Sequence, residues 1–323
     1  MEIRKIAILT SGGDAPGMNA AIRAVVRTAN YHHMEVIGVY RGYAGLLKKE
    51  FRLLLPEDTA DTIERGGTML YTARCKAFYE REGVLKGIEA LREEGVDALV
   101  AIGGDGTFRG AKAMADEGFP VIGIPATIDL DLGCTEYSIG FDTAVNTAME
   151  AIDKVRDTST SHERISIIEV MGRRAGYIAL WSGIACGSEE ILLPETYDYN
   201  DKALVDRILQ RENKGKKQHI IVNAEGIGES EGLARRIENL TGIETRATIL
   251  GYMQRGGSPT AKDRVTASQM GSHAVLALLE GRVNRVVVMQ DGRVKDIDIQ
   301  EALKIPKVLP EDLMEMTHSL VRS

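Results

Sequence analysis

Short runs of β-branched and apolar residues alternate along this chain with longer stretches of helical composition. In the first part of the chain the runs are residues 6–9, 36–39, 98–102 and 121–124, and the helical stretches are residues 19–29, 84–94 and 109–117. This spacing is typical of βαβ units, whose right-handed crossovers give a largely parallel sheet covered on both faces. Ligands of such sheets bind at the carboxyl ends of the strands.

A second alternating block begins beyond a boundary that the spacing puts near residue 140. It contains strand-like runs at residues 164–170 and 219–223 and a helical stretch at residues 176–186. Residues 286–294 carry an Asp-Gly pair between two apolar runs, which predicts a late hairpin. We therefore expect an α/β protein with a second α/β lobe.

Composition and charge exclude several classes of protein. The chain has 323 residues, 44% of them apolar, and a net charge of −7, which argues against a nucleic-acid surface. Cys75, Cys134 and Cys186 lie far apart and lack CxxC spacing, so the sequence favours neither a disulfide framework nor a structural zinc site. No run reaches the roughly 18 apolar residues of a membrane span, and no export signal precedes the first strand. We expect a cytoplasmic protein without membrane or nucleic-acid partners.

Two glycine-rich turns predict a nucleotide triphosphate site. Residues 10–17 read TSGGDAPG, residues 103–107 read GGDGT, and each turn follows an apolar run. Glycines let the backbone approach phosphate oxygens, and a following helix offers its free amides and dipole to the anion. The first turn is not a Walker loop, because Met18 and Asn19 occupy its lysine and Ser/Thr positions. A dinucleotide site at the second turn is a weaker alternative, because no acid follows about 20 residues on.

A third loop, residues 125–131, reads PATIDLD and follows another apolar run. If this segment is extended, Asp129 and Asp131 face the same side, so that one acid could hold a metal and the other accept a proton. Each acid alone is more typical of a turn or a helix cap. Beside two phosphate-binding turns, they indicate kinase chemistry.

Several basic residues fit small anions. Five arginines next to turns or strand ends can bind phosphate through their planar guanidinium groups: Arg74, Arg164, Arg173, Arg246 and Arg255. The basic stretch at residues 214–217 is either a solvated loop or a site for a regulatory anion.

Five motifs in order give the chain a resemblance to a known family. Residues 10–23, 103–106, 127–129, 171–173 and 254–259 resemble the matching segments of bacterial ATP-dependent 6-phosphofructokinases, and the resemblance extends over essentially the whole chain. The GGDGT motif alone also occurs in NAD and lipid kinases. The resemblance implies transfer of the γ-phosphoryl group of Mg-ATP to the 1-hydroxyl of fructose 6-phosphate, in a homotetramer.

The resemblance also implies a fold and a domain division. We expect two Rossmann-like α/β lobes with mainly parallel sheets and the active site in the cleft between them. The large ATP-binding lobe would comprise residues 1–140 and about 254–308. The small lobe, which binds the sugar phosphate, would comprise about 141–253 and 309–323.

The same resemblance assigns roles to individual residues. Asp129 falls on the general base, Arg173 and Arg74 on groups that stabilise the transferring charge, and Thr127 on a further catalytic position. The nucleotide positions are Gly13, Tyr43, Arg74, Cys75, Gly104, Asp105, Gly106 and Thr107. Magnesium would be held by Asp105 and Asp131. The sugar-phosphate positions are Thr127, Ile128, Asp129, Met171, Gly172, Arg173, Glu225, Tyr252 and Arg255, with Arg164 and Arg246 reaching in from a neighbouring subunit.

An effector site for ADP or phosphoenolpyruvate is implied in part. Its positions are Arg23, Arg27, Arg156, Gly187, Glu189, Lys214, Lys216 and Lys217. Pro56 stands where the family usually has an arginine, which removes one guanidinium group that could bind phosphate.

Other departures from the family concern the donor and the sugar phosphate. Gly106 and Ala126 are small where the pyrophosphate-using branch usually carries Asp and Lys, so ATP is favoured. Leu130 replaces an Asn between the two acids, and Tyr252 replaces a His that contacts the sugar phosphate. Tyr79 replaces a residue that is usually basic. Two alternatives therefore stay open: a kinase of the same fold for another phosphorylated ketose, and a nucleotide-binding regulatory paralogue with weak or no catalysis.

Overall fold

A computed structural model of the chain describes residues 3–322 and divides into two compact units. The first unit contains the chain up to Thr143 together with Arg255–Lys307, and the second contains Ala144–Gln254 and the segment from Val308 onward. The chain therefore passes between the units three times.

The first unit is built on a seven-stranded sheet in the order β11-β10-β5-β4-β1-β2-β3. Its five central strands are parallel, and β3 and β11 are antiparallel strands at the two edges. The bounds are β1 Lys5–Thr10, β2 Glu35–Val39, β3 Phe51–Leu53, β4 Ala98–Gly103, β5 Val121–Pro125, β10 Arg285–Gln290 and β11 Arg293–Asp298. The predicted parallel sheet is confirmed.

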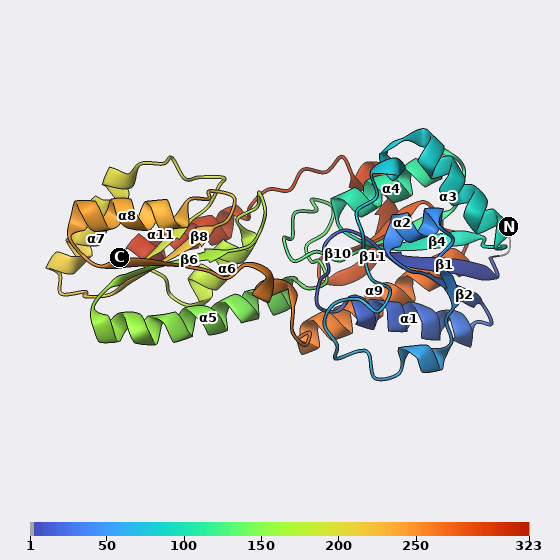
Figure 1. Ribbon diagram of the computed structural model, residues 1–323, viewed down its shortest axis with the longest axis horizontal. Coiled ribbons are helices and arrows are strands. Elements are labelled where there is room, and N and C mark those ends of the chain that lie inside the picture. The colour runs from blue at the N-terminus through green and yellow to red at the C-terminus, as the bar shows by residue number, and fades with distance from the viewer. Residues whose placement is uncertain (1–2, 323) are drawn as a thin grey trace. The chain divides into compact units, whose positions relative to one another are not determined.

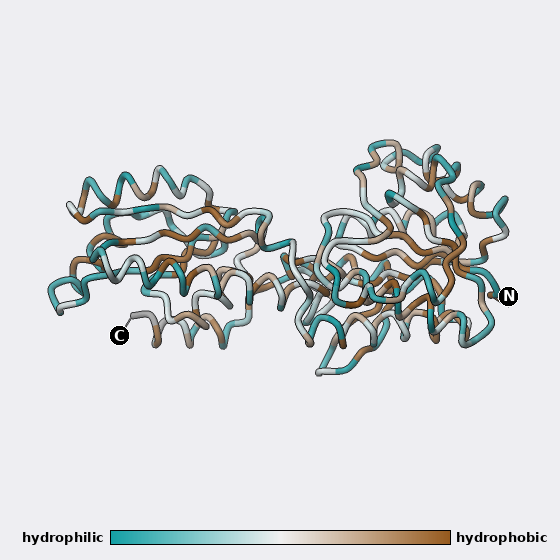
Figure 2. The backbone as a smooth tube through the Cα atoms, turned by 60° about the horizontal axis from the view of Figure 1, so that its bottom comes forward, coloured by the Kyte–Doolittle hydropathy of each residue, from teal (hydrophilic) through white to brown (hydrophobic). Residues whose placement is uncertain are grey.

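Helices cover both faces of this sheet. Figure 1 shows α1 (Met18–Tyr31) and α9 (Ala261–Leu279) on one face and α2 (Gly42–Leu47), α3 (Arg81–Glu93) and α4 (Asp105–Asp116) on the other. Strands β1, β4 and β5 are almost entirely buried, and Figure 2 shows the hydrophobic colour concentrated on the central strands. Continuous apolar strands of this kind are expected where both faces of a parallel sheet are covered. The short helix α10 (Ile299–Ala302) and the 3₁₀ turns η1 (Pro56–Thr59) and η2 (Lys76–Tyr79) complete this unit.

The second unit has a four-stranded sheet in the order β7-β8-β6-β9, in which all pairs are parallel. Its strands are β6 Ile165–Val170, β7 Glu190–Leu192, β8 His219–Ala224 and β9 Thr245–Ile249. Its helices are α5 (Phe141–His162, whose first turn belongs to the first unit), α6 (Tyr177–Ala185), α7 (Asp201–Asn213), α8 (Ser230–Thr241) and α11 (Glu311–Arg322), and η3 spans Gly251–Arg255. The predicted second α/β lobe is confirmed.

Local predictions were right at the hairpin and wrong at one helix start. Asp291 and Gly292 form the β10–β11 turn with φ values of 54° and 68°, as a two-residue hairpin turn of type I′ requires. Helix α4 begins at Asp105 rather than at residue 109, so Gly106 and Gly110 lie within the helix. The second half of the predicted glycine-rich turn, from Asp105 onward, is therefore the first turn of the helix itself.

A buried carboxylate joins the starts of α5 and α9. Asp263 is fully buried and accepts hydrogen bonds from the Tyr137 hydroxyl (2.5 Å) and the backbone amides of Gly140 (2.8 Å) and Thr143 (2.9 Å). Burial raises the pKa of Asp263, and the donors around it act in the opposite direction.

None of the helices among residues 3–322 has the length and apolar character needed to cross a bilayer.

Candidate active site

Three loops meet at the carboxyl ends of neighbouring strands in the first unit. We call residues 10–17 the first phosphate loop, residues 103–107 the second phosphate loop and residues 126–137 the acid loop; they follow β1, β4 and β5. Thr107 Oγ1 donates to the Ser11 carbonyl at 3.0 Å, and the amide of Ala126 donates to the Gly103 carbonyl at 3.0 Å. The two motifs and the acidic segment therefore form one continuous surface.

The second phosphate loop has the backbone geometry of an anion site. Gly104 caps α4 without any side-chain hydrogen bond, so the first amides of the helix remain available to a ligand. A Cβ on Gly103 would lie 2.3 Å from Thr107 Oγ1 and 2.4 Å from the Ser11 carbonyl, so only glycine fits there. Among the described residues, a Cβ on Gly106 would have no atom within 4 Å beyond its chain neighbours and the backbone of its own helix. The open side of the loop is the side a phosphate can approach.

Tyr43 supports this loop from the protein interior. It is buried, its ring stacks on Phe78 with 4.1 Å between centroids, and its hydroxyl donates to the Thr107 carbonyl at 2.7 Å. Burial raises the pKa of Tyr43. Arg74 is exposed and Cys75 half-buried, just before η2.

Arg255 lies against the first phosphate loop. A Cβ on Gly13 would lie 3.2 Å from Arg255 Cζ, so the guanidinium packs directly over the glycine backbone. The Thr72 hydroxyl donates to the Gly12 carbonyl at 2.8 Å and fixes the loop from another side. The structure thus brings one predicted sugar-phosphate arginine to the phosphate loops.

The acid loop presents Asp129 in a largely enclosed position. Asp129 is 8% exposed, and its backbone amide donates to Thr127 Oγ1 at 3.2 Å. Ile128 is buried beside it. Leu130 has a φ of 52°, so the segment is not extended and the expectation that Asp129 and Asp131 share one face of a strand is wrong. Turn chemistry overrides the alternation of a strand here.

The two acids predicted to hold magnesium are Asp105 and Asp131. Asp105 lies in the first turn of α4, its side chain is 41% exposed, and Arg109 Nε donates to it at 2.8 Å. Within residues 3–322 no group of three or more His, Cys, Asp or Glu side chains could hold a metal ion. Magnesium commonly takes one or two carboxylates and completes its shell with water and substrate phosphates.

A separate polar cluster lies at the carboxyl ends of β6 and β8 in the second unit. Glu225 Oε1 accepts from the backbone amides of Arg173 (2.5 Å) and Gly172 (3.3 Å). The amide of Met171 donates to Gln254 Oε1 at 2.8 Å. Gln254 is fully buried and its role was missed, although it stands inside a quoted motif. Arg173 is exposed with a φ of 59°, so its side chain is available to a ligand.

Arg164 and Arg246 do not join this cluster within one chain. Arg164 directly precedes β6, and Arg246 pairs in register with Ser166 at the start of β9. Both lie at the amino end of the sheet: along the strand direction, Arg164 is about 23 Å and Arg246 about 16 Å from the Met171 end. Tyr252, on η3, is 78% exposed.

Some of the predicted effector residues meet in the second unit. Arg156 Nη2 donates to the Cys186 carbonyl at 2.6 Å and lies 3.5 Å from the Gly187 carbonyl, and Glu189 pairs with Lys216 at 2.7 Å. Lys217 pairs instead with Glu212 at 2.8 Å, and Lys214 is exposed. Arg23 and Arg27 lie one turn apart on α1, in the first unit.

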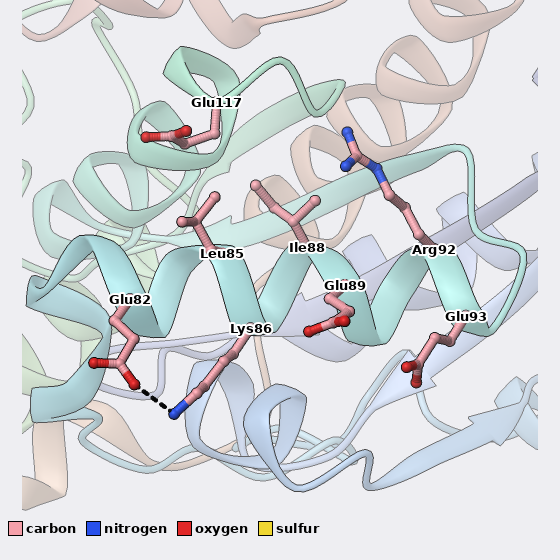
Figure 3. Close-up of a pocket in the computed structure, with 8 residues that line it drawn as sticks. All are labelled: Glu82, Leu85, Lys86, Ile88, Glu89, Arg92, Glu93 and Glu117. Atoms are coloured by element: carbon pink, nitrogen blue, oxygen red, sulfur yellow. Dashed lines mark hydrogen bonds and ion pairs between the residues drawn. The ribbon is translucent and has the colours of Figure 1, made fainter.

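A hollow on the outer face of α3 lies apart from these loops (Figure 3). Its charged lining comprises Glu82, Glu89, Glu93 and Glu117 against Lys86 and Arg92. Glu82 and Lys86 are paired at 2.7 Å. The excess of carboxylates disfavours phosphate, and we assign the hollow no part in the site.

The fold and these loops define a two-unit α/β protein that binds phosphorylated ligands. The sequence profile described as phosphofructokinase matches residues 5–278. The chain belongs to the phosphofructokinase family.

Relatives with known names support this assignment. The chain is 54% identical to ATP-dependent 6-phosphofructokinase 1 of Clostridium perfringens over 98% of this chain and 99% of the relative. It is 50% identical to ATP-dependent 6-phosphofructokinase of Brevibacillus brevis, again over 98% and 99%. The structure of phosphofructokinase from Saccharomyces cerevisiae superimposes with a TM-score of 0.87 at 32% identity, over 98% of this chain and 48% of the yeast chain. The chain thus spans about half of that yeast protein.

Proposed function

We propose that this protein transfers the γ-phosphoryl group of ATP to the 1-hydroxyl of fructose 6-phosphate, giving fructose 1,6-bisphosphate and ADP. The main support for the proposal is that the two phosphate loops and the acid loop lie side by side at the carboxyl ends of β1, β4 and β5. Phosphoryl transfer needs this combination of positioned phosphates, neutralised charge and a carboxylate at the attacking hydroxyl. The relatives' names supply the two substrates.

The nucleotide is assigned to the first unit. Gly13 and the amides of Gly104, Asp105 and Gly106 bind its phosphates, with Arg74 and Cys75 beside them. Thr107, whose own amide donates to the Gly104 carbonyl at 3.0 Å, closes the loop and is held in place by Tyr43. Asp105 and Asp131 hold Mg²⁺, which neutralises phosphate charge when bound. The open space at Gly106 and the small Ala126 leave room for the α-phosphate of ATP.

Asp129 is the general base in this proposal. Its carboxylate takes the proton of the sugar's 1-hydroxyl as that oxygen attacks the γ-phosphorus, and the bond to the ADP oxygen breaks. The Thr127 hydroxyl fixes the Asp129 backbone at 3.2 Å. Arg173 and Arg74 stabilise the charge that spreads over the phosphoryl oxygens.

Sugar-phosphate binding is assigned to groups from two chains. One chain contributes Met171, Gly172, Arg173, Glu225, Tyr252 and Arg255. Arg164 and Arg246 lie at the amino end of the β6–β9 pair, opposite to the end that carries Met171. This position supports a role for both arginines in the binding site of a neighbouring subunit. A homotetramer in the cytoplasm, with ADP or phosphoenolpyruvate acting at the Arg156–Glu189–Lys216 cluster, completes the proposal.

The test is a coupled assay for fructose 1,6-bisphosphate with ATP and magnesium, comparing the intact chain with Asp129→Ser. Loss of a general base lowers kcat by at least about 10²-fold. Asp116→Asn, at an exposed aspartate paired with Lys112 on α4, is the control and retains full activity. An Asp129→Ser variant that turns over at the intact rate would remove Asp129 as the base.

Two observations favour keeping a second candidate, a kinase for another phosphorylated ketose. Tyr252 is 78% exposed where the family uses a histidine on the sugar phosphate, and Leu130 takes a strained backbone between the two acids. A substrate panel separates the two candidates, because the preferred sugar phosphate has the higher kcat/KM. Nucleotide binding without turnover on any sugar phosphate would instead indicate a regulatory paralogue.

A further inference from the structure

A segment near the C-terminus lies directly on the acid loop. We call residues 303–307 the strap; it follows α10 and ends at the last residue of the first unit. Lys307 is half-buried, and its ammonium donates to the Thr135 carbonyl at 2.8 Å, across 172 positions of sequence. This hydrogen bond ties the end of the strap to the loop that carries Asp129 and Asp131.

The strap and the loop also touch through their backbones. A Cβ on Gly133 would lie 2.2 Å from the Ile305 carbonyl oxygen and 2.5 Å from the carbonyl of Pro306. Real side chains do not approach backbone this closely, so any residue larger than glycine would push the two segments apart. The φ angle of Gly133 is not positive, so its backbone conformation would accept any residue. Glycine is needed at this position only because of the close contact with the strap.

The opposite side of the acid loop is fastened to β10. The amide of Met289 donates to Thr135 Oγ1 at 2.9 Å, and the amide of Glu136 donates to the Met289 carbonyl at 2.9 Å. Thr135 is therefore held by β10 through its hydroxyl and by Lys307 through its carbonyl. The loop is clamped between a sheet strand and the strap.

Charge favours the same arrangement. The charged groups that act on the half-buried Lys307 include the carboxylates of Asp131 and Glu136, both on the acid loop. Burying an ammonium group costs free energy because the group loses hydration. Nearby carboxylates and a carbonyl that accepts its hydrogen bond compensate for this cost. Lys304, on the same strap, pairs with Glu301 at 2.7 Å and is 67% exposed, so it offers a matched comparison.

We propose that Lys307 is a positioning residue, which clamps the acid loop from the strap and so fixes where Asp129 and Asp131 present their carboxylates. The inference rests on the proposed function for its catalytic consequence, but the clamp itself is a physical property of the folded chain. Lys307 acts through Thr135 and Asp131 and takes no part in proton transfer.

The experiment compares Lys307→Met, Lys307→Arg and the control Lys304→Met in the full chain. Lys307→Met lowers kcat by about 10- to 100-fold, the range expected when catalytic groups are misplaced by up to about 1 Å, and changes the KM for ATP by less than about threefold. Lys307→Arg, which keeps a cation and donors, recovers most of kcat. Lys304→Met matches the intact chain.

Hydrogen exchange gives a readout that does not depend on turnover. Amides of residues 129–135 exchange at least about tenfold faster in Lys307→Met, while those of β1 and β4 are unchanged, because only the local clamp is lost. Gly133→Ala reproduces the faster exchange by displacing the strap. If Gly133→Ala fails to fold, the Met and Arg variants at Lys307 carry the test.

Three outcomes would overturn the inference: kcat of Lys307→Met within about twofold of the intact chain, equal losses in the Met and Arg variants, or unchanged exchange in residues 129–135. Failure of the proposed function is a different result. In that case the intact chain does not phosphorylate fructose 6-phosphate, yet the exchange difference between Lys307→Met and Lys304→Met still reports on the clamp.

Discussion

Two glycines of the second phosphate loop serve different purposes. A methyl group on Gly103 would collide with Thr107 Oγ1 and the Ser11 carbonyl at 2.3 and 2.4 Å, whereas one on Gly106 would meet, among the described residues, no atom within 4 Å beyond its chain neighbours and the backbone of its own helix. Gly103 is therefore required by packing, and Gly106 by the ligand. We therefore predict that alanine at Gly103 impairs folding stability, whereas alanine at Gly106 impairs nucleotide binding.

Gly103→Ala lowers the free energy of unfolding by about 1–3 kcal/mol, the usual cost of overpacking a close contact. Gly106→Ala leaves the free energy of unfolding within about 0.5 kcal/mol of the intact chain, since it adds a better helix former in open space, but raises the KM for ATP. Urea unfolding and initial rates measure the two effects. Equal stability losses in both variants would contradict the assignment of Gly106 to the ligand.

At Leu130 the backbone conformation is unfavourable for a leucine, but the burial of its side chain is favourable. Its φ of 52° lies in the left-handed region, which costs a leucine about 1–2 kcal/mol, and an asparagine would adopt it more readily. The side chain is only 4% exposed, and burying a leucine contributes about 1.5–3 kcal/mol. Burial offsets the strain, so the turn between the two acids is kept with a residue that local preference disfavours.

At the scale of one element, β8 begins with a buried histidine. His219 is fully buried, and neither ring nitrogen has a hydrogen-bond partner within residues 3–322. Burial lowers its pKa, the cations of Arg211 and Lys216 lower it further, and the carboxylates of Glu189 and Glu212 oppose the shift. Its ring Nε2 lies 3.7 Å from Glu212 Oε2.

This histidine predicts a loss of stability in mild acid. Above about pH 7 the ring is neutral in the folded and the unfolded chain; below the ordinary pKa of 6.5 the unfolded chain binds a proton that the folded chain does not. The free energy of unfolding therefore falls as pH decreases from about 7 toward the lowered pKa. The loss is about 1.4 kcal/mol for each pH unit that separates the folded-state pKa from the unfolded-state pKa.

His219→Phe removes this part of the pH dependence and keeps a ring in the space. His162→Phe, at an exposed position on α5, is the matched control and leaves the dependence unchanged. Unfolding in urea at several values between about pH 5.5 and 8 measures both. If the free energy of unfolding of His219→Phe changes with pH as much as that of the intact chain, other groups cause the pH dependence.

At the scale of the whole molecule, the two units carry different groups of predicted binding residues. The phosphate loops and the acid loop belong to the first unit, and the Met171–Arg173 and Glu225 cluster belongs to the second. Each substrate should therefore protect its own unit first. Mg-ATP slows amide exchange in residues 10–17 and 103–107, and fructose 6-phosphate slows it in residues 171–173 and at Glu225.

At a ligand concentration of 100 times Kd, binding stabilises the ligand-bound form of the protein by about 2.7 kcal/mol relative to the unbound form. An amide that exchanges only in the unbound form then exchanges about 100-fold more slowly. Unphosphorylated fructose serves as the control and gives little protection, because it lacks the group that the arginines recognise. Protection of the second unit alone by Mg-ATP would contradict the assignment of the nucleotide to the phosphate loops.

Local patterns were sufficient for the elements, and less so for the site. The alternation of apolar runs and helical stretches predicted six strands, β1, β2, β4, β5, β6 and β8, and Asp291-Gly292 predicted the β10–β11 turn, because both signals depend on neighbouring residues. Strands β3, β7 and β9 were not predicted. The start of α4 and the backbone at Leu130 were mistaken, since a helix cap and a buried turn overrode the pattern. Gln254 was quoted without a role, because its contact with Met171 spans 83 positions.

The sequence by itself determined the fold class, because alternating apolar runs and helical stretches specify βαβ units, and it predicted which residues have the chemistry for phosphate and metal. The tertiary structure alone decided how these residues are supported. Three contacts join distant segments: Tyr43 beneath Thr107, Lys307 on Thr135 and Arg255 over Gly13 span 64, 172 and 242 positions of sequence. Such contacts arise when the chain folds back on itself, and no periodicity or local motif encodes them.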